Sequence, residues 1–302
     1  MLFGVIVPFL GLVTAIVLLW GRAVGWVDLA LVLGLYSFTI SGVTIGFHRM
    51  FTHRALRGGP VLRFILGVAG SMSVQGSVLE WCAVHREHHK HSDRDGDPHS
   101  PHLHEDGFAG MMRGMVHAHL GWLFSQKRNP NPSVIADLIA DPVLVFVDRF
   151  SWVWIWLGWV LPAVIAGLIF RTWSAAFYGF IWGGLARTFL LHHVTWSINS
   201  VCHVWGRRRF ETPDHSRNNA VFGVLAFGEG WHNNHHAFPT SARHGFRWWQ
   251  VDFTYWMIRG LKALGLVWDV RLPTPAAIQA KERGGSAPLP VRPAKQTAAA
   301  AV

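Results

Sequence analysis

The chain has little cysteine: Cys82 and Cys202 are the only two in 302 residues. Two thiols cannot build a disulfide framework or a cysteine-based zinc motif. They also cannot hold an iron–sulfur cluster, which takes four cysteine ligands. The sequence likewise contains no heme-binding His-Pro-Gly-Gly motif and no flavin or NAD fingerprint after a predicted strand. Any redox chemistry would therefore need a different metal centre and an electron donor on another protein.

Charge is also scarce. Only 15% of the residues are charged and 51% are hydrophobic, whereas soluble domains average about 25% charged residues. Four apolar stretches come close to the about 20 residues that cross a hydrocarbon core: 3–20, 26–47, 150–170 and 173–195. We therefore predict an all-α membrane protein with four transmembrane helices in two hairpins, which turn around Arg22 and Arg171.

The charges that are present are mostly basic, 27 Lys and Arg against 17 Asp and Glu. Nearly all of the basic residues lie between the hairpins or after the second one, so the positive-inside rule makes these segments and both termini cytoplasmic. We expect a multi-pass protein, in a bacterial cell membrane, whose cytoplasmic segments form a helical cap. The basic excess suits anionic lipid headgroups or a phosphate-bearing substrate, and no module of basic and stacking residues predicts nucleic-acid binding.

One membrane domain is predicted to cover residues 1–272. Residues 273–302 are rich in Pro, Ala, Gly, Lys and Arg and contain almost no large apolar residue. Such a segment cannot bury a core, so we expect a disordered tail.

Histidines form three motifs at the spacing of metal ligands. The first motif is a pair five residues apart, and the second and third are both His-x-x-His-His. Positions i, i+3 and i+4 share one helix face, whereas a spacing of five requires a π-bulge or an exit from the helix. Eight imidazoles exceed the four of a closed structural zinc site, so two metals fit better, and imidazole alone does not choose among Fe, Zn and Cu. The motifs consist of His48 and His53; His85, His88 and His89; and His232, His235 and His236.

The apolar segment 61–84 separates the first two motifs and is interrupted by Gly, Ser and Gln. If it spanned the bilayer, the first two motifs would lie on opposite sides and could not share a metal site. An in-plane or re-entrant segment keeps them together, because irregular backbone is tolerated at depth when protein buries it. We therefore predict that this segment does not cross.

These motifs and their surroundings resemble the integral-membrane fatty-acyl desaturases of the stearoyl-CoA desaturase family. The likeness runs from roughly residue 30 to residue 260. The matching stretches are Gly46-Phe-His-Arg-Met-Phe-Thr-His53, Glu80-Trp81, His88-His89-Lys-His-Ser-Asp93, Asp97-Pro-His-Ser-Pro101, His119-Leu-Gly-Trp-Leu-Phe124 and Gly228-Glu-Gly-Trp-His-Asn-Asn-His-His-Ala-Phe-Pro239.

The resemblance implies a site for two iron ions (Fe²⁺) held by nine histidines. The ninth is His203, and Asn199 would hold a metal-bound water; the residues alone leave the role of His203 open. His192 and His193 are expected to pack or cap rather than ligate. The implied ligands are His48, His53, His85, His88, His89, His203, His232, His235 and His236.

A ligating imidazole also needs a hydrogen-bond acceptor for its second nitrogen. The sequence offers four acids near the motifs, each of which could equally be a solvated or capping acid: Glu80, Asp93, Asp97 and Glu229.

The family lines its acyl channel at positions that correspond here to Trp81, Gln75, Trp122 and Thr195. The two tryptophans would also suit an interfacial aromatic belt. Lys127 and Arg128 could pair with carrier phosphates or simply be solvated.

The resemblance implies an O₂-dependent desaturase of lipid biosynthesis that introduces a cis double bond, with Δ9 regiochemistry, into a fatty acyl thioester or acyl lipid. Its electrons would come from a ferredoxin- or cytochrome-type donor and its reductase. One departure leaves the acyl carrier open among CoA, acyl carrier protein and glycerolipid: the animal enzymes carry an Arg-Asp pair before the second motif, and here Ala83 and Val84 stand there.

Two other functions compete with desaturation. A fatty-acid or alkane hydroxylase on the same scaffold would add one oxygen to its product instead of removing two hydrogens. A non-enzymatic membrane metal carrier or sensor would need neither iron nor an electron donor.

Overall fold

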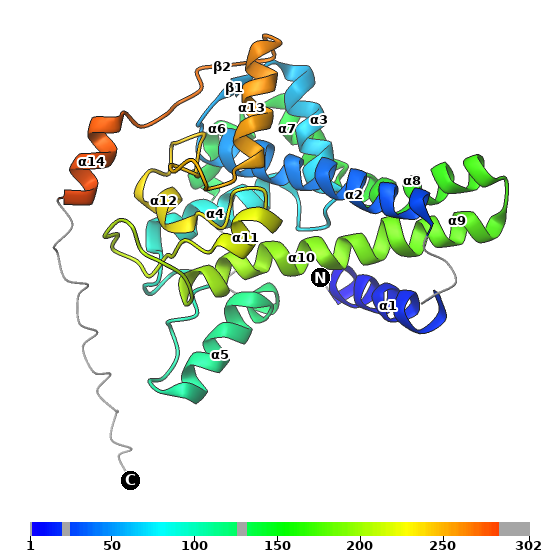
Figure 1. The fold of residues 1–302 in the computed structure, drawn as a ribbon, viewed down its shortest axis with the longest axis horizontal. Helices are drawn as coiled ribbons and strands as arrows, with labels where there is room; N and C mark the ends of the chain where they lie inside the picture. The colour runs from blue at the N-terminus through cyan, green and yellow to red at the C-terminus, as the bar shows by residue number, and fades with distance from the viewer. Residues whose placement is uncertain (1, 20–24, 126–131, 284–302) are drawn as a thin grey trace.

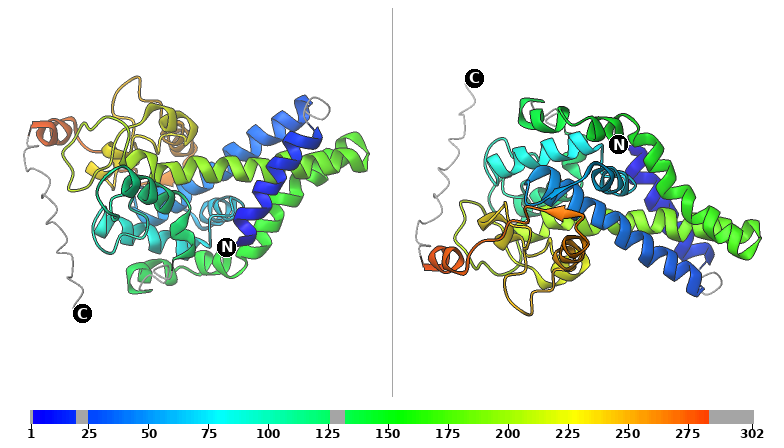
Figure 2. Two further views of the ribbon diagram at one scale, coloured as in Figure 1. Left: turned by 90° about the horizontal axis from the view of Figure 1, so that it is seen from below. Right: turned by 90° about the horizontal axis from the view of Figure 1, so that it is seen from above.

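The structure is a computed structural model that describes residues 2–19, 25–125 and 132–283. In these residues the fold is almost entirely helical, and the single sheet pairs β1 (Arg57–Gly58) antiparallel with β2 (Val267–Trp268). Figures 1 and 2 show long helices projecting from one end of a cap that gathers the shorter helices. This agrees with the helical fold expected from the sequence.

Four long helical stretches form the projecting part. They are α1 (Leu2–Leu19), α2 (Trp26–Ser41) continued by the π-helix η1 (Gly42–Thr52), α8 (Ser151–Phe170), and α9 (Trp173–Gly179) continued by the π-helix η5 (Phe180–Ala186) and α10 (Arg187–Asn199). They overlap all four predicted spans, and Trp20 of the first span lies outside the described residues. Two of them, Trp26–Thr52 and Ser151–Phe170, are both long and apolar enough to cross a membrane among the described residues.

The cap consists of short helices between and after the long ones. They are α3 (Pro60–Ser71), α4 (Val78–His91), α5 (Phe108–His119), η2 (Gly121–Phe124), η4 (Pro132–Ile135), α6 (Ala136–Ile139), α7 (Pro142–Arg149), η6 (Val201–His203), α11 (Ala220–Leu225), α12 (His232–Ala237), α13 (Phe253–Ala263) and α14 (Pro275–Arg283).

The segment 61–84 folds as α3, a turn and the start of α4. Twelve residues of α3 rise about 18 Å, which is short of the ~30 Å hydrocarbon core. Both α3 and α4 pack against η1. The approach to α3 is close, since an added Cβ on Gly42 of η1 would meet Gly70 N at 2.1 Å. The contact of α4 with η1 places the second histidine motif beside the first.

The predicted disordered tail begins with an ordered helix, because α14 covers part of it. Arg209 and Glu282 form an ion pair at 2.6 Å, and Lys281 lies over the ring of Phe238 at 5.0 Å. These contacts hold α14 against the cap, although the helix has few large apolar residues to bury. Residues 284–302 lie outside the described residues.

Candidate metal centre

The π-helix η1 aligns the two histidines of the first motif. His53 N donates to His48 O at 3.1 Å, an i→i−5 hydrogen bond. In this wider helix, residues five apart lie one turn apart, and the two rings approach to 4.8 Å between centroids. The spacing of five, which an ideal α-helix cannot use, is thereby explained.

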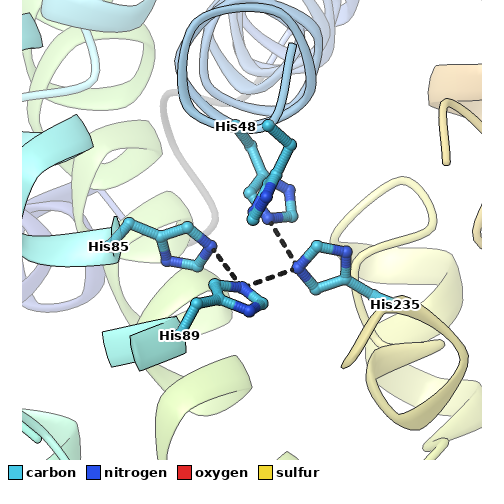
Figure 3. Close-up of side chains that lie close together, drawn as sticks. His48, His85, His89 and His235 are labelled. Carbon is cyan, nitrogen blue, oxygen red and sulfur yellow. Dashed lines mark hydrogen bonds between the residues drawn. The ribbon is translucent and has the colours of Figure 1, made fainter. Parts of the chain in front are cut away.

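Five histidines from three parts of the chain form the first cluster, and their ligand nitrogens lie within 4.8 Å of one another. Figure 3 shows four of them pointing inward from η1, α4 and α12. His235 Nε2 lies 3.1 Å from His48 Nε2 and 2.9 Å from His89 Nε2. Since one ring nitrogen carries at most one proton, it cannot satisfy both neighbours, whereas a shared cation can. The members are His48, His53, His85, His89 and His235.

Four histidines form the second cluster under the same 4.8 Å criterion. His232 Nε2 lies 3.0 Å from His203 Nε2 and 3.1 Å from His236 Nε2, which repeats the arrangement around His235. The second motif is divided between the clusters, because His85 and His89 join the first and His88 joins the second. The members are His88, His203, His232 and His236.

Two buried nitrogens test whether these residues fit a metal. His53 Nε2 and His88 Nε2 have no hydrogen-bond partner among the described residues. An unpaired buried nitrogen costs about 1–3 kcal/mol, and coordination would remove that cost at one site in each cluster. Burial also holds the pKa of His53 and of His232 well below the usual histidine range. Neutral imidazole is the form that binds metals.

Carboxylates orient the rings from the other side. His203 Nδ1 lies 2.8 Å from Asp93, and His88 Nδ1 lies 3.0 Å from Asp97. The third predicted acid lies on the first cluster, with Glu229 Oε2 2.6 Å from His48 Nδ1. A proton held on Nδ1 leaves the Nε2 lone pair free for the cluster.

Asp214 is a fourth such carboxylate, which the sequence analysis missed. It lies 2.8 Å from His236 Nδ1. Burial opposes its ionisation, but His236 beside it holds the pKa of Asp214 well below its usual range. No histidine motif surrounds this residue in the sequence, so no local signal marked it.

A buried ion network beneath the first cluster was also missed. Arg49 is completely buried, and its guanidinium lies 3.0 Å from both Glu229 and Asp252. His244 Nδ1 approaches Glu229 at 3.3 Å. Buried charges persist only when they are paired, so this network keeps Glu229 ionised and aimed at His48. A sequence cannot indicate partners separated by 180 residues.

A cavity adjoins the first cluster and contains the substrate residues predicted within the described chain. Gln75 Nε2 donates to Thr195 Oγ1 at 2.7 Å, and Trp81 stacks on His85 with ring centroids 5.0 Å apart. The lining consists of Gln75, Glu80, Trp81, Val84, His85, His99, Trp122, Thr195, Trp196 and Asn199. Glu80 thus lines the cavity, and Lys127 and Arg128 lie outside the described residues.

Histidines outside both clusters have other partners. His192 Nε2 lies 2.8 Å from Ser73 O, and His193 Nδ1 lies 2.9 Å from His119 Nε2. Neither therefore contributes to the clusters, in line with the expected packing role.

A family model described as fatty acid desaturase matches residues 7–269. The chain belongs to the fatty acid desaturase family. Two relatives support this: a hex-5-enoyl-[acyl-carrier protein] acetylenase of Moorena producens, 43% identical over 92% of this chain and 87% of its own, and an sn-1 stearoyl-lipid 9-desaturase of Anabaena variabilis, 38% identical over 82% of this chain and 85% of its own. The delta-9 acyl-lipid desaturase 1 of Arabidopsis thaliana is 36% identical over 82% and 77%.

Family membership confirms the assignment made from the histidine motifs. The desaturase is an oxidoreductase acting on fatty acyl substrates, and its histidine clusters are compatible with bound metal. A non-enzymatic metal carrier is therefore not the function.

Proposed function

We propose that this desaturase binds two iron ions, one in each histidine cluster, and introduces a cis double bond into a saturated acyl chain. The observation that carries the proposal is the convergence of nine histidine nitrogens in two groups beside a cavity that Trp81 and His85 line. Iron fits because imidazole accepts it and because the reaction needs a redox metal. When bound, the two iron ions supply oxygen activation and the removal of hydrogen from adjacent methylenes.

The protein residues position the substrate and the ligands. Trp81 joins the cavity to the first cluster by stacking on His85, so a chain in the cavity runs past the cluster. The acids hold the imidazole rings in one orientation, which keeps the ligands preorganised. Asn199 lines the same cavity, and we assign it the water-mediated role that the family implies.

The overall reaction requires O₂, two electrons and two protons for each double bond, and it releases two molecules of water. A separate donor of the ferredoxin or cytochrome type supplies the electrons. We further propose that the chain crosses the membrane four times, so that both termini and the histidine clusters lie on the cytoplasmic side. Residues 1–272 would form one membrane domain.

We propose Δ9 regiochemistry, as the names of two of the relatives state for those proteins. The relatives differ in carrier, with an acyl carrier protein in one name and a lipid in another. Val84 lines the cavity, whereas Ala83 is buried in the hydrophobic core, so neither position offers the charged pair of the animal CoA enzymes.

The proposal is tested by expressing the desaturase in a host that lacks unsaturated fatty acids and mapping double bonds in its lipids by mass spectrometry. We expect products two hydrogens lighter, with the double bond at C9. His88→Ala and His235→Ala should abolish them, whereas His104→Ala, which alters a histidine outside both clusters, should not. A hydroxylated product would identify a hydroxylase and a triple bond an acetylenase, and either would contradict the proposed desaturation to a double bond. Activity in His88→Ala would contradict the proposed set of metal ligands.

A further inference from the structure

A second hollow of the cap is rich in arginine and lies beside the third histidine motif. Its wall includes Arg207, Arg208, Arg209, Arg247, Trp231 and Trp249. These residues come from three separate segments, so their convergence is a property of the fold. We call this hollow the arginine groove.

The arginine groove has an excess of positive charge. Arg207 and Arg247 are exposed, and neither forms an ion pair with another described residue. Arg208 donates to the main-chain oxygen of Thr212 at 2.8 Å. Arg209 alone is paired, with Glu282.

That single ion pair shows which ligand chemistry the groove accepts. Glu282 comes from α14 and lies on the groove wall, and its carboxylate reaches Arg209 Nε at 2.6 Å. Arginine recognises carboxylates strongly through its fork of donors. The remaining arginines can bind further carboxylates only if another molecule supplies them.

The groove is tied directly to the second cluster. Trp231 lies on the groove wall and is followed in the chain by His232 of the second cluster. Exposed Trp249 meets Trp231 edge-on, with ring centroids 5.5 Å apart. The main-chain N–H of Arg209 donates to Asn233 Oδ1 at 2.8 Å, which joins the arginine segment directly to α12.

The groove is distinct from the acyl cavity, because the two share no lining residue. A partner in the groove would approach the second cluster without blocking the cavity beside the first. An acyl carrier has to reach the mouth of the acyl cavity, whereas an electron donor has to reach only the metal ligands.

We infer that the arginine groove is the docking surface for the electron donor, a small redox protein with carboxylates around its redox group. This inference rests on the proposed function, which requires two electrons for each double bond. A one-electron donor docks twice in each cycle and is oxidised each time, and the electrons enter through Trp249, Trp231 and His232. Complementary charge mainly accelerates such encounters and makes them sensitive to salt.

The test uses the purified full-length desaturase in detergent with NADPH, ferredoxin reductase and an acidic plant-type ferredoxin as the probe. The variant Arg207→Glu/Arg247→Glu should raise the KM for ferredoxin about tenfold and flatten its salt dependence, as expected for charges at a docking rim. The kcat at saturating ferredoxin should change less than about twofold. The control Arg259→Glu/Lys262→Glu on α13 makes the same charge change away from the groove.

Chemical reduction separates this inference from the proposed function. When the metal centre is reduced anaerobically with dithionite in place of ferredoxin, and excess dithionite is removed before O₂ is added, a single turnover should give equal unsaturated product in the wild type and the groove variant. An unchanged KM for ferredoxin in the groove variant overturns the docking inference. The inference is also overturned if the groove variant loses binding to anionic phosphatidylglycerol vesicles and keeps the wild-type KM for ferredoxin. Absence of unsaturated product from the dithionite-reduced wild type would refute the proposed function itself.

Discussion

At the scale of single residues, the carboxylates that face the histidines decide how well each cluster can hold a metal. Each of Asp93, Asp97, Asp214 and Glu229 holds the Nδ1 side of one ring. Partners of this kind are typically worth about 10–100-fold in metal affinity. The clusters therefore depend on these acids as well as on the imidazoles.

Asp214→Asn should weaken iron binding in the second cluster. Its amide cannot accept the Nδ1 proton of His236 as a charged group, so affinity for the second iron should fall about 10–100-fold. When the variant is titrated with a chelator, its iron content, measured by elemental analysis, should fall from two ions per chain toward one at chelator concentrations that leave the wild type with two. Asp95→Asn, which alters an exposed acid, serves as the control. Equal iron retention in both variants would contradict this role.

At the scale of elements, the contact between η1 and α3 places the first motif. Gly42 has no room for a side chain because an added Cβ would meet Gly70 N at 2.1 Å and Ala69 C at 2.5 Å. Backbone cannot move aside as a flexible side chain can. The close packing of the π-helix against α3 therefore requires glycine at position 42.

Gly42→Ala should destabilise the desaturase by about 1–3 kcal/mol, the usual cost of overpacking. Gly34→Ala is the matched control in the same long helix, since an added Cβ there meets nothing within 4 Å. It should be neutral or slightly stabilising because alanine favours helix. Thermal unfolding in detergent measures both, and equal unfolding temperatures would show that η1 can shift without cost.

Asp137 joins α6 to neighbouring elements through Arg86 and Arg54, at 2.6 and 2.7 Å. Burial opposes its ionisation, but hydrogen bonds from these arginines lower the pKa of Asp137. A lowered folded pKa stabilises the fold above the pKa of the unfolded chain, about 3.9, and this contribution disappears as the pH falls through the folded value.

Asp137→Asn should therefore unfold about 2 °C below the wild type at neutral pH, a small effect because the site is partly exposed. The difference should start to shrink as the pH falls below about 3.9 and should vanish only below the lowered pKa of folded Asp137. Unfolding temperature against pH measures it, with exposed Asp106→Asn as the comparison. If the difference in unfolding temperature between the wild type and Asp137→Asn does not change with pH, the effect comes from packing and not from the charge.

At the scale of the whole molecule, the cap can bring three motifs together only if they share one side of the membrane. Both native cysteines are buried, and burial raises the pKa of the Cys82 thiol to about 12. Neither should react quickly with maleimides, since the thiolate is the reactive form. The folded protein thus gives a low background for mapping topology with introduced cysteines.

Arg171→Cys in the turn between α8 and α9 should be labelled in intact cells by a membrane-impermeant maleimide. Asp95→Cys, in the loop after α4, should be labelled only after the cells are permeabilised. Both positions are exposed, so accessibility depends on the side of the membrane. Labelling of both from outside would refute the four-span topology.

The sequence alone was informative wherever the signal is local. Long apolar stretches predicted the long helices, and histidine spacing predicted ligands that the fold gathers into two clusters. The five-residue spacing of His48 and His53 predicted either a π-bulge or an exit from the helix, and the structure has a π-helix there. Helical periodicity is set by neighbouring residues, so it can be deduced without the fold.

Other features depend on contacts between distant residues and could be found only in the tertiary structure. Packing places His88 in the second cluster although His85 and His89 lie in the first. It also brings Asp214 to His236 and Arg49 to Glu229. Three chain segments meet to form the arginine groove. The sequence by itself determined the histidine motifs of the candidate metal centre and the helical class. Only the fold decided which imidazoles, acids and arginines meet, because side chains far apart in the chain acquire partners only when the helices pack.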